Sequence, residues 1–522
     1  PSSSLYGTSA FFAVINVITQ RGKDLDNVEV SADAGSFDTY KGRFSYGHVF
    51  DNALEILISA SLYDSAGQEL YFKEFDDPET HNGFTSKAAD KQEFQSAFFI
   101  GAYGPLNLQA GYVSRTKRLP TAAWETVFNG RTELLDEQTF VDLKYEASLG
   151  ENSDLMARVS YSVYEYGGEY LFDYAEEEDD PSDLAVNVDV AEGQWWLGEV
   201  KLSTSAINRN KITLGTEWRL NTQQDQQNYD RGWEDDPWLD SRQDSSVWAL
   251  YLQDEIRIHD GILLNAGIRY DNYDTFGGKA NPRIALICQP FDETTIKVLY
   301  GKAFRAPNTF ELYYNDGDED ATQKGNVDLR PEEITTYEVV VEQKLGEHFR
   351  GKVSLYHYKI DDLITEQIDP DDELIVYRNA NETEANGIEV VLTAKLESGI
   401  EGRARYSFSD AKDGKTDIRL SNSPRHMGKV NISFPVMSRK LFGGVELQYM
   451  GERSTLAGEI SDGSLIANAT VSSHGLLGGL DMSISVYNLF DKSHGDPGSA
   501  ENEQDIIEQD GRTFRVKLLY RF

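Results

Sequence analysis

Two kinds of connection alternate along this sequence, and their order limits the possible folds more than any single motif does. Segments in which apolar and polar residues alternate recur about 22 times, each roughly 8–14 residues long, as expected of β-strands. Short connections such as 51–52, 104–105 and 260–261 take turns with long ones. The long ones include 66–92, 115–139, 167–193, 222–245, 304–334, 361–384 and 489–511.

This alternation predicts a closed antiparallel barrel rather than a sandwich or a propeller. In a meander of hairpins, odd and even connections lie at opposite ends, so one end receives tight turns and the other long loops. Transmembrane barrels have this asymmetry, with short periplasmic turns and long extracellular loops. We therefore predict an all-β transmembrane barrel of about 22 strands. The alternative is a soluble all-β binding or enzyme module.

The final segment, GRTFRVKLLYRF at 511–522, supports a barrel. Phe514, Val516 and Leu518 alternate with Arg515 and Lys517, so one strand face is apolar and the other cationic. The sequence ends inside this strand, as a closing strand would, because closure leaves no edge to protect.

The totals exclude several classes of protein. The chain has 49 basic and 88 acidic residues and a net charge of −39, which argues against nucleic acid as a partner. The excess of acidic residues either serves solubility or gives a surface that attracts cations. Cys288 is the only cysteine, so an intrachain disulfide and a thiolate metal cage are ruled out. No apolar run is long enough for a spanning helix, and we expect no helix of ordinary length.

Five motifs occur in order along nearly the whole chain. They are LYGTSAFFAVINVITQ at 5–20, YGKAFRAPNTFELY at 300–313, LRPEEITTYE at 329–338, NANETEANGIE at 379–389, and YNLFDK at 487–492 followed by the closing strand. Together they resemble the conserved motifs of TonB-dependent outer-membrane receptors. The resemblance implies a 22-stranded barrel with a plugged lumen in the bacterial outer membrane, with membrane lipids around it.

The same resemblance suggests two domains and a missing portion. Residues 1–26 correspond to the end of the family's plug domain, and residues 27–522 to the barrel. Phe12 and Ala13 stand where the family usually has Gly, and Gln20 where it has Lys. The chain begins at Pro1 without a signal peptide, and only about the last twenty plug residues are present. We expect TonB to bind through a preceding N-terminal segment.

Aromatic residues in polar loops are the candidates for ligand contact. Tyr229, Trp233 and Trp238 lie in the acidic stretch YDRGWEDDPW, where large rings can stack on a planar ligand. Trp124, Phe128, Tyr313 and Tyr314 are further candidates, and packing of the loops is the alternative for all of them. Arg305 either faces a ligand or plug carboxylate or has a structural role at the end of its strand.

Metal binding and catalysis have little support in the sequence. Asp316, Asp318 and Asp320 have the spacing of a calcium loop, but Ala321 and Val327 stand where that motif needs Gly and Glu. Apart from this weak Ca²⁺ candidate we expect no cofactor. The His residues show no metal-ligand spacing, and nothing places Ser, His and a carboxylate together, so we do not expect an enzyme.

The leading hypothesis is a receptor that takes up a scarce, bulky nutrient, most often a ferric siderophore in this family. An acidic mouth would disfavour strongly anionic chelates, which leaves a neutral or cationic metal chelate, or cobalamin. The alternative from another class is a barrel without a plug that acts as a passive pore or as a scaffold for surface proteins, including a surface lipoprotein.

Overall fold

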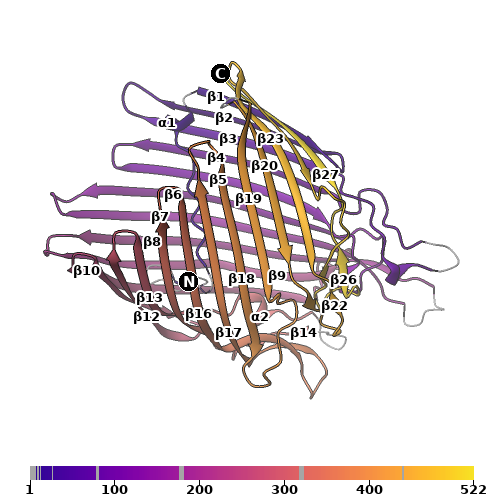
Figure 1. The fold of residues 1–522 in the computed structure, drawn as a ribbon. Coiled ribbons are helices and arrows are strands. Elements are labelled where there is room, and N and C mark those ends of the chain that lie inside the picture. The colour runs from indigo at the N-terminus through magenta and orange to yellow at the C-terminus, as the bar shows by residue number, and fades with distance from the viewer. Residues whose placement is uncertain are drawn as a thin grey trace.

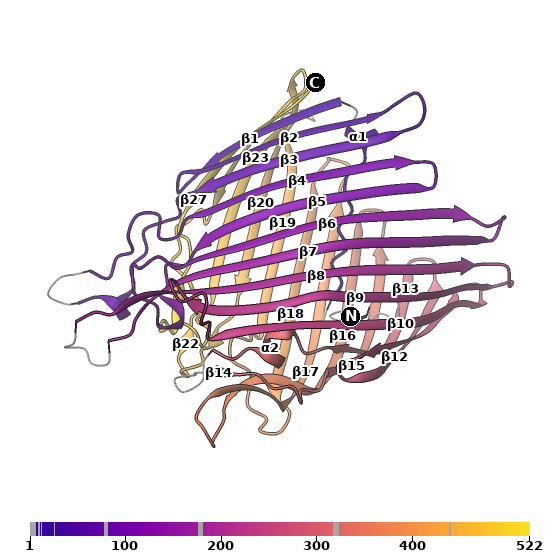
Figure 2. The same ribbon diagram turned by 180° about the vertical axis from the view of Figure 1, so that it is seen from behind.

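The structure is a computed structural model that describes residues 7–8, 11, 13–25, 27–77, 82–175, 181–316, 323–437 and 440–522. One sheet of 23 strands contains almost all of the β-structure, and Figures 1 and 2 show it closed into a barrel. The two-residue strand β14 lies in a connection and pairs in parallel with β17. The other 22 strands form the wall, and each pairs antiparallel with its neighbours in the chain. The predicted fold and strand number are confirmed.

The wall strands differ widely in length. They are β1 (Asn27–Gly35), β2 (Thr39–Val49), β3 (Glu55–Ser65), β4 (Gln92–Tyr103), β5 (Leu106–Arg118), β6 (Glu133–Ser148), β7 (Ser153–Asp173), β8 (Leu184–Thr204), β9 (Asn210–Asp230), β10 (Leu239–His259), β11 (Ile262–Tyr273), β12 (Gly277–Phe291), β13 (Thr294–Arg305), β15 (Glu332–Leu345), β16 (Phe349–Ile368), β17 (Ile375–Lys395), β18 (Glu401–Asp413), β19 (His426–Met437), β20 (Leu441–Met450), β23 (Ser464–Leu477), β24 (Leu480–Tyr487) and β27 (Thr513–Arg521).

The remaining elements are short and lie outside the wall. They are α1 (Gly22–Leu25), η1 (Lys73–Phe75), η2 (Ala123–Glu125), α2 (Thr309–Tyr313), β14 (Gln323–Lys324), β21 (Arg453–Ser454), β22 (Ile460–Ser461), β25 (Gly495–Pro497) and β26 (Ile506–Glu508). No helix within the described ranges combines the length and the apolarity that crossing a bilayer requires.

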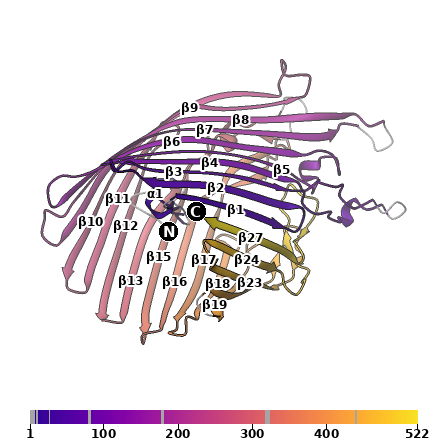
Figure 3. The ribbon, with the colours of Figure 1, turned by 90° about the horizontal axis from the view of Figure 1, so that it is seen from above.

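The barrel closes where its last strand meets its first, as Figure 3 shows. In this register Val30 lies opposite Tyr520, and Ala32 lies opposite Leu518. Phe514, Val516 and Leu518 are exposed on the outer face, while Arg515 bonds the buried Asp33 on the inner face. The closing strand therefore has its apolar face toward lipid and its cationic face toward the lumen, as the sequence indicates.

Long connections gather at one end of the barrel, which we call the outer mouth, and tight turns at the other (Figures 1 and 2). Two connections at the outer mouth are tight, 36–38 between β1 and β2 and 274–276 between β11 and β12. The 36–38 turn has Phe37 and Asp38 at positive φ, a conformation that Asp adopts more readily than most residues.

Several connections are shorter than the sequence suggested. The expected loops 167–193 and 222–245 are wrong in extent, because β7, β8, β9 and β10 are each 21 residues long and leave only 174–183 and 231–238 between them. Above the bilayer both faces of a strand meet water, so the alternation of apolar and polar residues stops there. The loop 361–384 shrinks to 369–374 for the same reason.

Candidate ligand-binding site at the outer mouth

A short helical segment after β13 packs against the wall at the outer mouth. Its helix, α2, begins after Asn308, whose side chain accepts a hydrogen bond from the Glu311 backbone, while the Glu311 carboxylate accepts one from the Asn308 N–H. This capping box fixes the start of a helix too short to be stable alone. Gln224 on β9 donates to the Thr309 hydroxyl at 2.8 Å and joins the segment to the barrel.

Arg305 at the end of β13 is engaged with two carboxylates of the protein. Its guanidinium makes two bonds to Glu332, at 2.6 and 2.9 Å, and one to Glu311, at 3.1 Å. The planar fork of Arg suits this bidentate pairing. Of the two roles expected for Arg305, the structural one at the strand end fits these contacts.

A buried polar group lies behind α2 on the inner face of β8 and β9. The Tyr314 hydroxyl is 3.2 Å from Asn228 Nδ2 and 3.4 Å from both carboxylate oxygens of Asp189. Asn228 also bonds Asn187 and Asp189, at 2.9 and 3.1 Å, and Asn187 reaches Asp230 at 3.1 Å. Burial, and then the carboxylates of Asp189 and Asp316, raise the pKa of Tyr314, so its phenol stays a neutral donor.

Stacked aromatic rings follow the inner face of β7 toward the extracellular side. Tyr170, Phe172 and Tyr174 stack in sequence, with centroids 6.4 and 6.0 Å apart. Trp124 from the β5–β6 connection meets Tyr170 edge-on at 5.5 Å. Exposure rises along the strand from Tyr170, which is buried, to Tyr174, which is 47% exposed. Tyr174, at the outer end of the stack, is therefore the ring most open to solvent.

The connection 488–512 crosses the mouth to reach this aromatic group. The backbone N–H of Trp124 donates to the Glu501 carbonyl at 2.7 Å. Gln504, which is only 1% exposed, donates to the Thr121 carbonyl at 3.0 Å. This connection starts from β24 and ends at β27, so it reaches past the tops of β1 to β4 to contact the β5–β6 connection.

These elements place rings, carboxylates and amides beside one another at the outer mouth. Such a surface can stack on flat groups and accept hydrogen bonds from donors or cations. Among the described side chains we find no cluster of three or more His, Cys, Asp or Glu arranged to hold a metal ion. Of the calcium candidate, Asp316 accepts a hydrogen bond from the Gln323 backbone at 2.8 Å, while Asp318 and Asp320 lie outside the described residues.

The structure separates the aromatic residues that the sequence grouped. Tyr229 was expected in a loop, which is wrong: it lies in β9, on the face opposite Asn228 and so outside the lumen. Trp233 and Trp238 do lie in the connection 231–238, 67% and 49% exposed. The three rings therefore do not form one group: Tyr229 lies on a wall strand, and the two tryptophans are exposed in the connection. Tyr313, at the end of α2, is half-buried against a cluster of Leu312, Leu329 and Ile364.

Sequence reasoning missed the residues that the fold brings together here. Asn187, Asp189 and Asn228 lie in strands that were read as loops, so their common face was hidden. A period of two in YLFDY at 170–174 was the available signal for the β7 rings.

Below the outer mouth, the N-terminal segment lies against an ionic network on the lumen wall. Arg269, only 1% exposed, bonds Asp271 at 2.8 Å and Glu217 at 3.0 Å. Gly7 packs on this pair so closely that a Cβ there would come within 2.9 Å of the Arg269 guanidinium. The Thr8 hydroxyl accepts from the Ala306 N–H at 3.0 Å.

Phe11 is the last described residue of 7–18 that is buried against the wall, and exposed residues follow it. Phe11 is buried against Ala303, Ile334 and Ile360. Val14, Ile15, Val17 and Ile18 are exposed.

Comparisons with known proteins agree with this architecture. A family model described as TonB-dependent receptor-like, β-barrel, matches residues 71–489, which is most of the chain. The chain belongs to the TonB-dependent receptor family. Members of this family are outer-membrane transporters rather than enzymes, and the protein is a bacterial outer-membrane protein.

Three solved structures superpose along the whole chain. The ferric-catecholate import receptor Fiu from E. coli K12 matches with a TM-score of 0.77 and 15% identity, over 100% of this chain and 85% of that one. The ferric enterobactin receptor PfeA from Pseudomonas aeruginosa gives 0.78 and 16%, over 100% and 84%. The copper transporter OprC gives 0.77 and 15%, over 100% and 84%. At this identity the likeness shows the fold.

Proposed function

We propose that this TonB-dependent receptor takes up a bulky metal chelate of neutral or positive charge, most simply a ferric siderophore. The observation that carries this proposal is the lining of the outer mouth, where the stacked β7 rings lie near carboxylates. Asp189 has only neutral donors, Asn228 and Tyr314, among its described hydrogen-bond partners. Two of the superposable structures are named as receptors for ferric chelates, which supports the class of ligand.

Charge at the mouth sets the kind of chelate. Arg305, the cation nearest α2, is already paired with Glu311 and Glu332 and is not available to an anion. Glu501 approaches Glu366 and adds further negative potential. A strongly anionic chelate would be repelled by these groups, whereas a cationic or neutral one gains in local concentration.

The proposal also includes TonB as the source of energy for uptake. Residues 7–25 would then belong to a domain that fills the lumen. The contacts of Gly7, Thr8 and Phe11 with the wall support that assignment, as does the start of β1 at Asn27. We place the domain boundary at residue 26.

Uptake of radiolabelled iron tests the function. Cells that lack their own siderophore receptors and express this protein are supplied with ferric chelates of positive, zero and negative charge. We expect TonB-dependent uptake of a neutral or cationic chelate. Equal uptake with and without TonB would instead indicate a passive pore, and no uptake of any chelate would contradict the proposal.

Two neighbouring residues on β9 give a matched pair of variants. Asn228→Ala removes a buried amide that holds Asp189 and Tyr314 in place, and through the loss of that arrangement it should lower chelate affinity by about tenfold. Tyr229→Ala, on the opposite face, should leave affinity unchanged. Trp233→Ala and Trp238→Ala test whether the exposed loop rings also contact the ligand.

A further inference from the structure

Two phenol groups meet beside a carboxylate on the lumen face of β7 and β8. The hydroxyls of Tyr166 and Tyr170, both on β7, are 2.5 Å apart. The ring of Tyr170 lies over Gly168, where a Cβ would come within 2.6 Å of the hydroxyl oxygen. Gly168 is the register partner of Asp189 on β8, and both phenols are within electrostatic range of that carboxylate. The two phenol oxygens therefore meet next to Asp189.

A buried amide oxygen near these groups has no partner. Gln226 on β9 is only 9% exposed, and its Oε1 accepts no hydrogen bond from any described residue. Gln224, two residues before it, bonds Thr309 of α2, and Asn228, two residues after it, bonds Tyr314. Gln226 therefore lies beneath the segment that contains α2. A buried acceptor without a donor is costly, so its presence points to a ligand at this position.

The register brings this oxygen close to the phenols. Ala191 on β8 is the register partner of both Tyr166 on β7 and Gln226 on β9, and its methyl group fills little of the space between them. Asp189 is the diagonal neighbour of the same two residues. Diagonal neighbours on one face of a sheet are within reach of long side chains. The phenols, the carboxylate and the amide oxygen therefore face a common point on the lumen wall.

The chemistry of this oxygen set matches a hard trivalent cation. A metal ion binds the deprotonated form of its ligands and so displaces their protons. Two phenolates and one carboxylate carry three negative charges, equal in number to the positive charges of Fe³⁺. A buried site favours such a neutral combination, because uncompensated charge is costly away from water. Ca²⁺ instead draws on carboxylates and carbonyls, of which this cluster has few.

We propose a binding site for Fe³⁺ itself at the outer mouth, formed by the phenols of Tyr166 and Tyr170, the carboxylate of Asp189 and the amide oxygen of Gln226. Each phenol O–H bond breaks as its oxygen bonds the iron, and the two protons pass to the solvent. The iron stays ferric, and the weak chelator that delivered it leaves with its own charges. The inference rests on the proposed function only for the arrival of iron at the mouth.

Visible absorption tests this site, because phenolate bound to ferric iron gives a charge-transfer band that carboxylate ligands do not give. The folded protein in detergent is titrated with ferric nitrilotriacetate. We expect the band to appear in the wild type and to saturate at a single equivalent of iron. The double change Tyr166→Phe and Tyr170→Phe keeps both rings but removes both oxygens. The band should then disappear, and the affinity for iron should fall by about tenfold or more.

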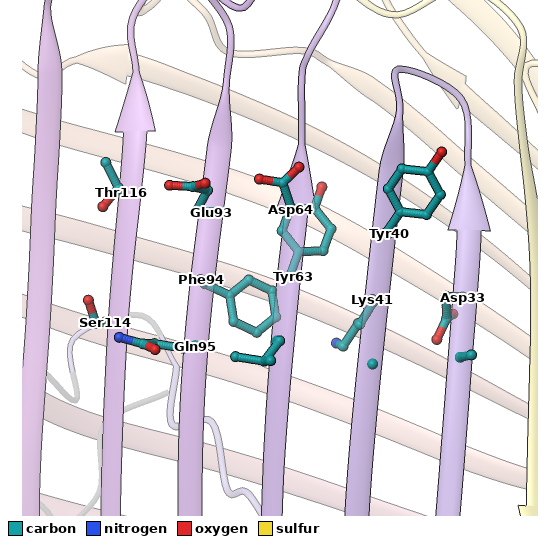
Figure 4. A pocket seen from close by; sticks show the side chains of 13 residues that line it. Asp33, Tyr40, Lys41, Tyr63, Asp64, Glu93, Phe94, Gln95, Ser114 and Thr116 are labelled. Carbon is teal, nitrogen blue, oxygen red and sulfur yellow. The ribbon is translucent and has the colours of Figure 1, made fainter.

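Tyr63 supplies a matched control for the loss of a phenol. Figure 4 shows Tyr63 on β3 beside Phe94 on β4, and the two rings stack with their centroids 5.0 Å apart. Both residues share the lumen face with Asp33 by register. Tyr63→Phe removes a phenol oxygen from another part of the lumen wall, so it should leave the band and the affinity for iron unchanged.

Two results would overturn the site. They are the absence of the band in the wild type and an undiminished band in the folded double variant. Folding of each variant is checked by the shift in gel mobility on boiling. Cellular uptake separates this inference from the proposed function: uptake of a ferric chelate without any band would overturn the Fe³⁺ site alone, whereas a band without uptake of any chelate would overturn the proposed function alone.

Discussion

At the scale of single residues, the fork of Arg305 holds α2 to the barrel. Its bonds to Glu332 and Glu311 join the end of β13, the start of β15 and the first turn of α2. Arg305→Lys keeps the charge but loses the bidentate pairing, so it should destabilise this region by about 1–2 kcal/mol. Hydrogen exchange of residues 306–316 should speed up while exchange in β13 stays unchanged. Unchanged exchange throughout would show that the fork does not hold the segment.

Asp369 makes a second clamp at the outer mouth, and this one depends on pH. It bonds Lys324 at 2.7 Å and Arg378 at 2.6 Å, and so holds β14 beside β17. The hydrogen bond from Lys324, followed by that from the Asp371 backbone, lowers the pKa of Asp369 from 3.8 to about 2. Because the folded pKa is depressed, the clamp is complete above about pH 4 and is lost as the pH falls through about 2.

Pepsin cleavage measures the loss of this clamp. Cleavage within 323–331, read by mass spectrometry, should be slow at pH 4 and rise toward pH 2 in the wild type. Asp369→Asn lacks the charge at every pH, so the difference in cleavage from the wild type should be largest at pH 4 and become smaller toward pH 2. Equal cleavage of the two proteins at pH 4 would contradict the clamp.

At the scale of elements, glycines facing aromatic rings keep the wall strands packed. Tyr251 on β10 lies over its register partner Gly215 on β9, where a Cβ would come within 2.2 Å of the ring. Tyr356 covers Gly387, and Phe140 covers Gly111, in the same way. Each ring fills the space above a residue without a side chain, a pairing known to stabilise sheets.

Gly215→Val tests this packing. The new side chain would displace Tyr251, break its 2.7 Å bond to Glu199 and destabilise the barrel by about 1–3 kcal/mol. Gly198→Val on β8 is the matched control, because a Cβ there meets nothing within 4 Å. Urea unfolding in lipid vesicles should show a lower midpoint for Gly215→Val only. Similar urea midpoints for both variants would show that the pairing of ring and glycine does not stabilise the barrel.

Sequence patterns predict the strands where they contact lipid and fail where they do not. Alternation located all the wall strands, because one face of each must be apolar within the bilayer. It failed above the bilayer, where Glu192 and Asp225 on the outer face look like loop residues. The ligand-site candidates suffered most, since Asp189 and Asn228 meet only through the register of β8 and β9. Register between strands is a long-range property that local patterns do not contain.

At the scale of the whole molecule, ion pairs on the lumen side reinforce the seam that closes the barrel. Arg515 reaches Asp33 at 2.7 Å, and Arg521 reaches Glu29 at 2.9 Å and Asp481 at 2.7 Å. Glu29 and Asp33 are buried; Glu29 has a second partner in Arg43 on β2, whereas Asp33 relies on Arg515. The ladder between β1 and β27 is also short, with nine-residue strands on both sides.

Arg515→Ala therefore should weaken closure more than an ordinary change on the lumen wall. It leaves the buried Asp33 without its guanidinium, at a cost of about 1–3 kcal/mol. Lys517→Ala serves as the control. It removes a charge from the same face of β27, but Lys517 forms no ion pair with any residue that the structure describes. A folded barrel migrates faster on a gel than the same protein after boiling. The temperature at which this fast-migrating form disappears should be lower for Arg515→Ala than for the wild type or the control.

Because a barrel without its seam exposes two strand edges in lipid, unfolding should begin at the seam. Hydrogen exchange that starts in β1 and β27 would support this order, and exchange that starts elsewhere would contradict it.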